Sequence, residues 1–589
     1  MNTLPSLIVR LWRHLSFRRQ RQFSILLVLM IIVSLAEIIS IGAVLPFLAV
    51  LTDPKHIFSL PSLQPILVLL DIQSSKSLLL WLTICFATGA FMAGLMRLVF
   101  LRASLRLSFA AGADLGYQIY RKTLYQPYSI HVSRNTSEVI DGITNKTSLV
   151  TDGVIMPALY VASSVIMLFV ILTTLISVAP EITLSAFLGF GIIYLVIMRI
   201  TRYQLQENSK LMASESPKVI KNLQEGLGGI RDVLIDGSQE IYCESYKKSE
   251  SLLRKAYASS SFISISPRYA MEALGMVLIA VFAYFLAGSS SGISGAIPIL
   301  GLLALSAQRL LPIMQQAYGS WSTLRRNQYS LIDTLNFLDQ DIPDYADKDA
   351  VSPLSFKKRI GLNHVSYRYG LDMPMILNDL SLVIPKGAQV GFIGATGGGK
   401  STLLDVVMGL LSPTSGSLQI DDVVITPDNL RSWQFHIAHV PQSIFLADTS
   451  IAENIAYGIP FESIDMARVE EAAQIAQILP VIESLPNKFK TLVGERGVRL
   501  SGGQRQRIGL ARAIYKRSAV IILDEATSAL DTLTEAAVME AIELYGKDLT
   551  VLIIAHRTST LRNCSMVVEL DQGKIKRVGT YDEITGIQG

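Results

Sequence analysis

Residues 394–402 read GATGGGKST and fit the phosphate-binding pattern G-x-x-x-x-G-K-[ST]. The apolar segment QVGFI precedes this loop and TLLDVVMGL follows it, so a strand and a helix should flank the motif. Glycines let the backbone curl until successive N–H groups point at phosphate oxygens. The pattern therefore predicts an ATP site in which Lys400 reaches the β- and γ-phosphates and Ser401 ligates Mg²⁺. The other loop residues predicted to contact the nucleotide are Gly394, Thr396, Gly397, Gly399 and Thr402.

A second segment, VIILDE (520–525), has the residue types that hydrolysis requires. Its four apolar residues predict a buried strand that carries Asp524 to the metal ion. Glu525 follows at once and is placed to polarise the attacking water. An acidic pair elsewhere would more often form structural ion pairs, but after an apolar strand in a P-loop domain the catalytic interpretation is favoured.

Between these two motifs lies LSGGQ (500–504), a pentapeptide by which the chain resembles the ATP-binding cassette (ABC) family over residues 356–589. The resemblance implies that two cassettes pack head to tail. In that arrangement Ser501, Gly503 and Gln504 of one cassette close over the nucleotide held by the P-loop of the other.

Further positions match the family in the expected order. The resemblance implies that Tyr369 stacks on adenine, that Gln442 touches Mg²⁺ and water, and that His556 senses the γ-phosphate. It also implies that SALD (528–531) joins the two sites, and that GERG (494–497) meets the cytoplasmic helices of the other copy. Taken singly, Tyr369 and His556 would also fit ordinary packed side chains.

The elements before the cassette are predicted to be membrane spans. Half of the 589 residues are hydrophobic, and the mean hydropathy is +0.41. A bilayer-crossing helix needs about 20 apolar residues. Six segments meet this length: 22–48, 78–100, 157–179, 182–200, 270–288 and 293–315. The first follows an arginine-rich start but is too long for a secretory signal core, so we expect it to be retained.

Lys and Arg residues are concentrated in the amino terminus and in segments 101–155 and 201–268, whereas the opposite loops carry only Lys55 and Lys76. This asymmetry predicts that both termini and the cassette are cytoplasmic, in the inner (cytoplasmic) membrane. The long cytoplasmic segments look helical, and the apolar stretch 60–72 fits a short helix on the outer face.

The predicted fold is an α-helical polytopic membrane domain with six spans, of ABC exporter type, followed by an α/β P-loop cassette. The domains are expected at 1–340 (membrane), 341–355 (linker) and 356–589 (cassette). This layout resembles the half-transporters among ABC exporters. The resemblance implies a homodimer, with short coupling helices near 127–137 and 214–224. A net charge of +4 gives no case for nucleic-acid binding.

Charged residues inside the spans are candidate contacts for the transported substrate, because a charge in a bilayer is costly and usually functional. Arg97, Arg268 and Arg309 lie in the predicted cytoplasmic third of their spans and would suit phosphate or pyrophosphate groups. Each arginine alone also fits snorkelling toward headgroups, and Arg268 could pair with Glu272 one turn later. Glu37, near the middle of the first span, fits either an interior partner for a cation or a substrate contact.

Local stretches such as SLAEIISIGAVLPFLAVL and PRYAMEALG (267–275) resemble two narrower groups. These are the lipid-linked oligosaccharide flippases of bacterial protein N-glycosylation and the envelope polysaccharide exporters of heterocyst-forming cyanobacteria. The resemblance implies a polyprenyl-pyrophosphate-linked glycan or a glycolipid as substrate. The alternatives are a multidrug or lipid A-type exporter, a peptide exporter, a soluble ABC protein and an ATP-gated channel.

Overall fold

The computed structural model describes residues 3–52, 75–178, 180–287, 292–347, 352–370, 372–527, 529–546, 548–555 and 558–586. The chain divides into two compact units. The first comprises Met1–Gln126 and Arg134–Asp341, and the second comprises Pro127–Ser133 and Ile342–Gly589. The predicted outer helix at 60–72 lies outside the described residues.

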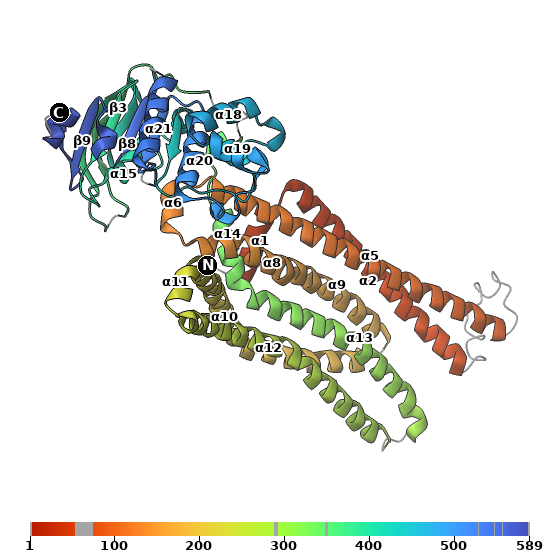
Figure 1. Ribbon diagram of the computed structural model, residues 1–589. Helices are drawn as coiled ribbons and strands as arrows, with labels where there is room; N and C mark the ends of the chain where they lie inside the picture. The colour runs from red at the N-terminus through yellow and green to blue at the C-terminus, as the bar shows by residue number, and fades with distance from the viewer. Residues whose placement is uncertain are drawn as a thin grey trace. The chain divides into compact units, whose positions relative to one another are not determined.

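Six long helices of the first unit coincide with the six predicted spans (Figure 1). They are α2 (Phe17–Thr52), α5 (Ser75–Leu124), α9 (Met156–Val178), α10 (Pro180–Gly228), α12 (Gln239–Ala287) and α13 (Gly292–Arg326). In the described part of the chain, four helical stretches are long and apolar enough to cross a membrane: Phe17–Glu37, Ser77–Leu124, Thr136–Thr174 and Phe187–Gly228. These correspond to the first four predicted spans.

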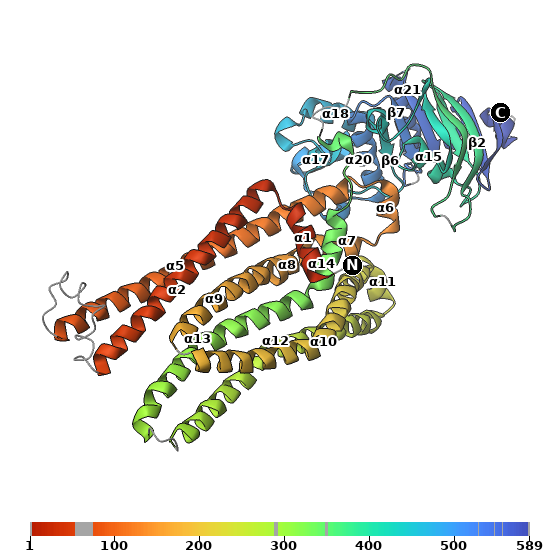
Figure 2. The same cartoon turned by 180° about the vertical axis from the view of Figure 1, so that it is seen from behind.

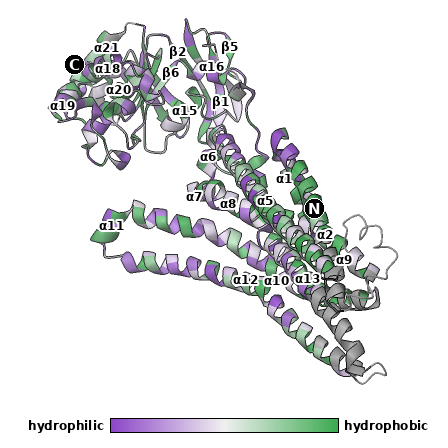
Figure 3. Ribbon diagram, turned by 90° about the vertical axis from the view of Figure 1, so that its right-hand side faces the viewer, coloured by the Kyte–Doolittle hydropathy of each residue, from purple (hydrophilic) through white to green (hydrophobic). Residues whose placement is uncertain are grey.

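The long helices pack in neighbouring pairs. α2 lies along α5, α10 lies along α12, and α13 packs against both α9 and α12; both ribbon views show these pairs side by side (Figures 1 and 2). Hydrophilic residues become frequent along α10 and α12 toward the turn that joins them (Figure 3). The polar helical extensions predicted from the sequence are therefore confirmed.

Short elements complete the first unit. They are α1 (Leu4–His14), α7 (Thr136–Asp141), the π-helical turns η1 (Gly142–Lys146) and η2 (Thr151–Ile155), α8 (Thr147–Val150), α11 (Ile230–Ile235) and α14 (Gln328–Leu338). The prediction of a separate short helix near 214–224 was wrong, because α10 runs without interruption to Gly228. The short helix of this turn is α11. The other predicted short helix is α6 (Tyr128–Ser133), which belongs to the second unit.

The second unit is built on two sheets. A four-stranded antiparallel sheet has the order β2 (Leu377–Pro385), β1 (Arg359–Tyr367), β4 (Ser415–Ile420), β5 (Val423–Val424). A six-stranded sheet has the order β10 (Lys574–Gly579), β9 (Met566–Asp571), β3 (Gln389–Ile393), β8 (Thr550–Ile554), β7 (Val520–Asp524), β6 (Ile437–Val440). All its neighbours are parallel except β10 and β9. The α/β cassette fold is thereby confirmed.

Helices surround these sheets. They are α15 (Lys400–Val407), α16 (Leu430–Gln434), α17 (Ile451–Ile455), α18 (Met466–Ile475), α19 (Leu479–Ser484), α20 (Gly502–Tyr515), α21 (Thr532–Tyr545) and α22 (Tyr581–Thr585). One core joins both sheets to α15 and includes Trp433, whose indole N–H donates to the carbonyl of Val407 at 2.8 Å. Because the central strands are buried on both faces, the ends of β3, β6 and β7 are held in fixed register beneath the loops that follow them.

Candidate functional site

The P-loop occupies the connection between β3 and α15. Three of its glycines have left-handed φ angles: 141° at Gly394, 82° at Gly397 and 94° at Gly399. A side-chain carbon at position 394 would lie 2.0 Å from the carbonyl oxygen of Leu570 on β9, so only glycine fits. Thr396 and Gly397 are exposed at the bend. The strand–loop–helix context predicted for this motif is confirmed.

The loop's side chains face its open side. The ammonium of Lys400 donates to the carbonyls of Gly394 at 2.8 Å and Ala395 at 3.0 Å, so it already lies along the phosphate cradle. Ser401 hydrogen-bonds to Asp524. The Tyr369 hydroxyl and the Thr402 hydroxyl are 3.3 Å apart, which holds this half-exposed aromatic beside the start of α15.

The acidic half of the site follows the carboxyl ends of β6 and β7. Asp524 ends β7, and Glu525 adopts a left-handed φ of 51° while its N–H donates to the Ile554 carbonyl at 3.0 Å. Such a conformation is uncommon for a residue with a side chain and is found disproportionately at active sites. Gln442, two residues beyond β6, donates its amide N–H to the Glu525 carboxylate at 2.5 Å. The structure thus brings together four predicted residues: Ser401, Gln442, Asp524 and Glu525.

Carboxylates are crowded here. Burial raises the pKa of Asp524, and the neighbouring Glu525 raises it further, whereas the Ser401 hydrogen bond and Lys400 lower it. Burial, with the charge of Asp524, raises the pKa of Asp405 to about 6. The hydroxyl, carboxylate and amide oxygens of Ser401, Asp524 and Gln442 are hard donors of the kind that Mg²⁺ prefers. The residues present therefore fit a Mg²⁺ ion, which would also relieve this crowding.

The signature motif forms the start of α20. Ser501 caps the helix, accepting from the Gln504 N–H at 3.3 Å, while the Gln504 side chain accepts from the Ser501 N–H at 2.9 Å. A side-chain carbon at Gly503 would lie 3.1 Å from the Ala529 carbonyl, so the helix start packs closely on the segment that follows β7. Within the described chain, none of the hydrogen bonds of Ser501 or Gln504 reaches the P-loop.

The remaining cassette predictions are only partly described. Ser528 and His556 lie outside the described residues. Asp531, the last residue of SALD, caps α21 by accepting from the Thr534 N–H at 3.0 Å. The N–H of Ala529 donates to the Gln506 side chain at 2.9 Å, which ties this segment to the signature helix.

In the first unit, Glu37 forms an ion pair with Arg97. The glutamate side chain is only 2% exposed and that of the arginine 48%. The sequence left two roles open for Glu37, and the structure pairs it with a cation. Arg268 pairs with Glu272 at 2.9 Å, as its spacing predicted. The Arg309 side chain lies outside the described residues.

Arg97 and Arg268 lie on different long helices of the first unit. Arg97 belongs to α5, which packs against α2 and α9, whereas Arg268 belongs to α12, which packs against α10 and α13. The two arginines therefore lie on helices with different neighbours, and they pair with different carboxylates, Glu37 and Glu272.

A pocket of about 650 Å³ opens beside Arg268. It is lined by Ser264, Ile265, Arg268, Glu272, Gln308, Leu311, Pro312, Gln315 and Gln316.

Two family models match the chain. Residues 23–308 match the model of the ABC transporter transmembrane region, and residues 377–528 match the model described as ABC transporter. The ATP-dependent lipid A-core flippase of Albidiferax ferrireducens is 30% identical over 80% of this chain and 81% of its own length. The chain is an ABC transporter. With its membrane region and cassette on one chain, this ABC transporter is an ATP-driven exporter of the half-transporter layout.

Other relatives span most of the transporter. The heterocyst differentiation ATP-binding protein HepA of Nostoc sp. (strain PCC 7120) is 28% identical over 94% of this chain and 90% of its own length. The putative multidrug export protein YgaD of Bacillus subtilis (strain 168) is 29% identical over 77% of this chain and 78% of its own. A solved bacterial Atm1-family ABC exporter with ATP bound has a TM-score of 0.79, 23% identity and 97% coverage of both chains.

Sequence reasoning missed Asp405 in this transporter. It lies four residues after Ser401 on α15, so one turn of helix puts both side chains on the same face. That spacing was available in the sequence. The sequence did not show that Asp405 lies near Asp524. That proximity depends on the order of β3, β8 and β7 in the sheet.

Replacing Glu525 tests the acidic half of the site. Glu525→Gln keeps the hydrogen-bonding shape but removes the base, so phosphate release should fall by about 10²- to 10⁴-fold. Binding of a fluorescent ATP analogue should stay within about twofold, because no phosphate contact is removed. The matched control is Glu540→Gln, because Glu540 is an exposed acid on α21. The control transporter should hydrolyse ATP at the parent rate. A Glu525→Gln transporter that hydrolyses ATP at the parent rate would contradict the assignment.

The raised pKa of Asp405 predicts that replacing this residue with asparagine stabilises the protein, and that the gain depends on pH. The pKa of Asp405 is about 6 in the folded protein, against an ordinary value of 3.8. The ionised carboxylate therefore destabilises the fold above pH 6. This destabilisation decreases as the pH falls from about 6 to 3.8. Asp405→Asn should therefore raise the thermal midpoint by about 2 °C at pH 7.5 in EDTA, and by less at pH 4.5. The exposed Asp428→Asn serves as control. An equal gain at both pH values would refute this electrostatic origin.

Proposed function

We propose that this transporter is a homodimer whose two ATP sites are each shared between copies. The domains would be the membrane part (1–340), a linker (341–355) and the cassette (356–589). The signature residues support sharing, because in the described chain the side chains of Ser501 and Gln504 bond within the cap of α20 and not to the copy's own P-loop. In the dimer, Ser501, Gly503 and Gln504 of one copy would cover the P-loop of the other.

An exposed apolar helix also supports a second copy. The turn between α10 and α12 carries α11, where Ile230, Leu234 and Ile235 are exposed, the last at 82%. Apolar side chains gathered on a polar extension usually mark a protein interface. We assign this face to contact with the second copy.

The mass in detergent tests the homodimer. Light scattering of the purified chain, corrected for bound detergent, should give the mass of two chains. Substituting Leu234→Ser and Ile235→Ser should shift that mass toward one chain, because less apolar area is buried on association. The control is Val423→Ser and Val424→Ser, exposed valines of β5. A single-chain mass for the parent would contradict the proposal.

Within each ATP site the side chains have distinct roles. The loop from Gly394 to Thr402, including Thr396, Gly397, Gly399 and Lys400, would hold the phosphates, with Tyr369 stacked on adenine. Glu525 would accept the proton of the attacking water, with Gln442 orienting its carboxylate and His556 contacting the γ-phosphate. Mg²⁺, held by Ser401, Asp524 and Gln442, would neutralise charge on the phosphate oxygens when bound. The left-handed backbone of Glu525 supports this, because it aims the carboxylate at Gln442.

Membrane orientation follows from the distribution of charge. We propose that the transporter lies in the cytoplasmic membrane with both termini and the cassette inside, since Lys and Arg gather on that side of the spans.

The cargo we propose is a lipid-linked oligosaccharide or polysaccharide precursor, or a glycolipid. The pocket beside Arg268 carries this proposal, because it combines the Arg268–Glu272 ion pair, three glutamine amides and a serine hydroxyl with the apolar side chains of Ile265, Leu311 and Pro312. Amides and hydroxyls suit sugar hydroxyls, a guanidinium suits phosphate, and the apolar side chains suit a lipid chain. This lining suits an amphiphile with a polar head.

The alternative is a multidrug or lipid A-type exporter. Relatives carrying those names support it, namely YgaD and the lipid A-core flippases. Lipid A also has a phosphorylated head, so the pocket suits it better than it suits apolar drugs. A labelled drug, a labelled lipid A and a labelled glycan-linked lipid would separate the three classes.

Flux into proteoliposomes tests the cargo. A labelled polyprenyl-pyrophosphate glycan should cross with ATP and stay in place with Glu525→Gln. Arg268→Ala should reduce this flux about tenfold, because a charge-assisted hydrogen bond is lost, while basal ATP hydrolysis continues. Arg254→Ala is the matched control, since Arg254 makes the same i, i+4 pair with Glu250 (2.6 Å) on the same helix. If the transporter moves a lipid or drug normally but does not move the glycan, the glycan assignment is contradicted.

A further inference from the structure

The chain passes between its two units at three points. It leaves the first unit after Gln126, returns at Arg134, and leaves again after Asp341. The first two points flank α6, the short helix that belongs to the cassette unit, and the third follows α14. These three points are where the chain connects the two units.

Side chains at the end of α5 bind the chain directly after α14. The ammonium of Lys122 donates to the backbone carbonyls of Leu338 at 2.5 Å and Gln340 at 2.8 Å. The side-chain amide of Gln126 donates to the backbone carbonyl of Asp341 at 2.9 Å. The first and third crossing points are therefore joined by three hydrogen bonds to backbone, which do not depend on a neighbouring side-chain rotamer.

Arg134 connects the second crossing point to the same place. Its guanidinium donates to the amide oxygen of Gln340 at 3.0 Å, in the amide orientation that satisfies both groups. It also lies 5.7 Å from the ring centre of Phe337 on α14. All three crossing points thus meet at residues 337–341.

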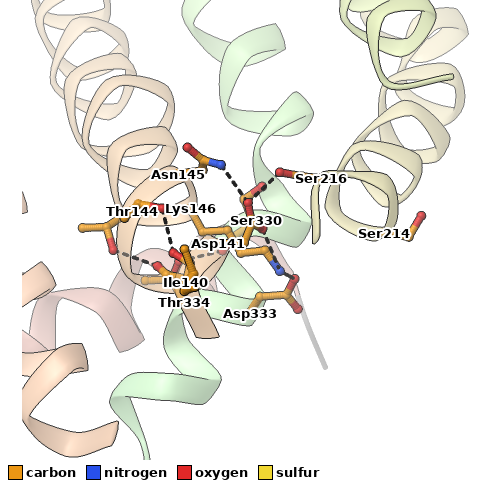
Figure 4. A network of polar contacts seen from close by, with 12 residues as sticks. Ile140, Asp141, Thr144, Asn145, Lys146, Ser214, Ser216, Ser330, Asp333 and Thr334 are labelled. Atoms are coloured by element: carbon orange, nitrogen blue, oxygen red, sulfur yellow. Dashed lines mark hydrogen bonds and ion pairs between the residues drawn. The ribbon is translucent and has the colours of Figure 1, made fainter. Parts of the chain in front are cut away.

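A buried polar network anchors this junction (Figure 4). The ammonium of Lys146 lies 2.6 Å from the Asp333 carboxylate of α14 and 3.8 Å from that of Asp141. Asp141 is fully buried and accepts hydrogen bonds from Ser216 of α10 at 2.6 Å and Asn145 at 3.0 Å. The Lys146 side chain is only 7% exposed. One ammonium and one carboxylate therefore join three separate helical segments.

The backbone around Lys146 is shaped for this contact. Lys146 ends the π-helical turn η1, and π-helical turns are rare and often mark functional positions. At the start of that turn, a side-chain carbon at Gly142 would lie 2.6 Å from the Phe337 ring, so glycine allows α14 to approach closely.

We propose that Lys122 and Lys146 are positioning residues that couple ATP binding to movement of the membrane helices. Together with Gln126, Arg134 and Asp333 they form what we call the junction clasp. If α14 moved without η1, the ammonium of Lys146, which is only 7% exposed, would lose its Asp333 partner while staying buried, which is strongly unfavourable. The clasp therefore makes α6 and α14 transmit cassette movement as one piece. This inference rests on the homodimer with shared ATP sites proposed above.

Spin-label distances in the reconstituted full chain test the clasp. The parent carries Glu525→Gln, replacements of Cys85, Cys243 and Cys564, and one label at Leu80→Cys. Leu80 is 60% exposed and lies about 63 Å along α5 from Lys122. In the parent, Mg²⁺-ATP should shift the label–label distance between the two copies.

Lys146→Met and Lys122→Met should each lose at least about half of this shift while binding of the fluorescent ATP analogue stays within about twofold. A purely structural role would instead lower both binding and yield. Lys218→Met is the matched control, because Lys218, whose side chain is 58% exposed, pairs with Glu215 of its own helix and with no clasp residue, so the shift should stay unchanged. If Lys146→Met does not fold, Lys122→Met decides, since its partners are backbone carbonyls.

A full shift in the lysine variants would overturn the clasp proposal. Loss of the shift in Lys218→Met as well would also overturn it, because the effect would then not be specific to the clasp. A parent that binds nucleotide without any shift would instead contradict the shared-site homodimer proposed above, and the clasp with it. The two failures are therefore distinguishable.

Discussion

The approach of the P-loop to strand β9 is the constraint on which the ATP site depends. The Leu570 carbonyl occupies the space that a side chain at position 394 would need. The chain can therefore leave β3 only with glycine there, at a φ angle that other residues rarely adopt. The loop is thus pressed against the sheet, Lys400 folds back along it, and α15 starts immediately afterwards. Parallel pairing of β3 with β9 and β8 holds this geometry in place.

The same sheet brings negative charge together at one edge. Asp524 and Glu525 arrive from β7, and Gln442 arrives from the end of β6. Burial raises the pKa values of Asp524 and Asp405 because an ionised carboxylate is poorly solvated there. A site of this kind stores unfavourable electrostatic energy that a bound cation can remove. The proposed catalytic geometry and the proposed affinity for Mg²⁺ would thus have one physical origin.

The membrane unit handles charge in a different way. Several of its described charges are paired, as in Glu37 with Arg97, Arg268 with Glu272, and Lys146 with Asp333. Two of these pairs join different helices, so they also favour one arrangement of those helices over others. Arg268 is paired within its own helix and lines a pocket. It can therefore meet a ligand without disturbing helix packing.

The sequence by itself determined the six long helices, the order of the domains and the P-loop context, because these depend on local patterns: apolar runs of about 20 residues, a glycine-rich loop, and an apolar strand ending in Asp524 and Glu525. The helical extensions of the spans were also predictable from their polar, uninterrupted character. Pairing with Glu272 followed from spacing along one helix, since i and i+4 residues share a face.

Only the tertiary structure decided which distant groups meet. Glu37 could have faced a substrate or a cation, and the packing of α2 on α5 gave it Arg97. Asp405 lies near Asp524 because of strand order, and α11 rather than 214–224 forms the short helix of its turn. Lys146 is tied to Asp333, 187 residues away. Such contacts depend on how surfaces pack, and a local pattern holds no information about a partner that far along the chain.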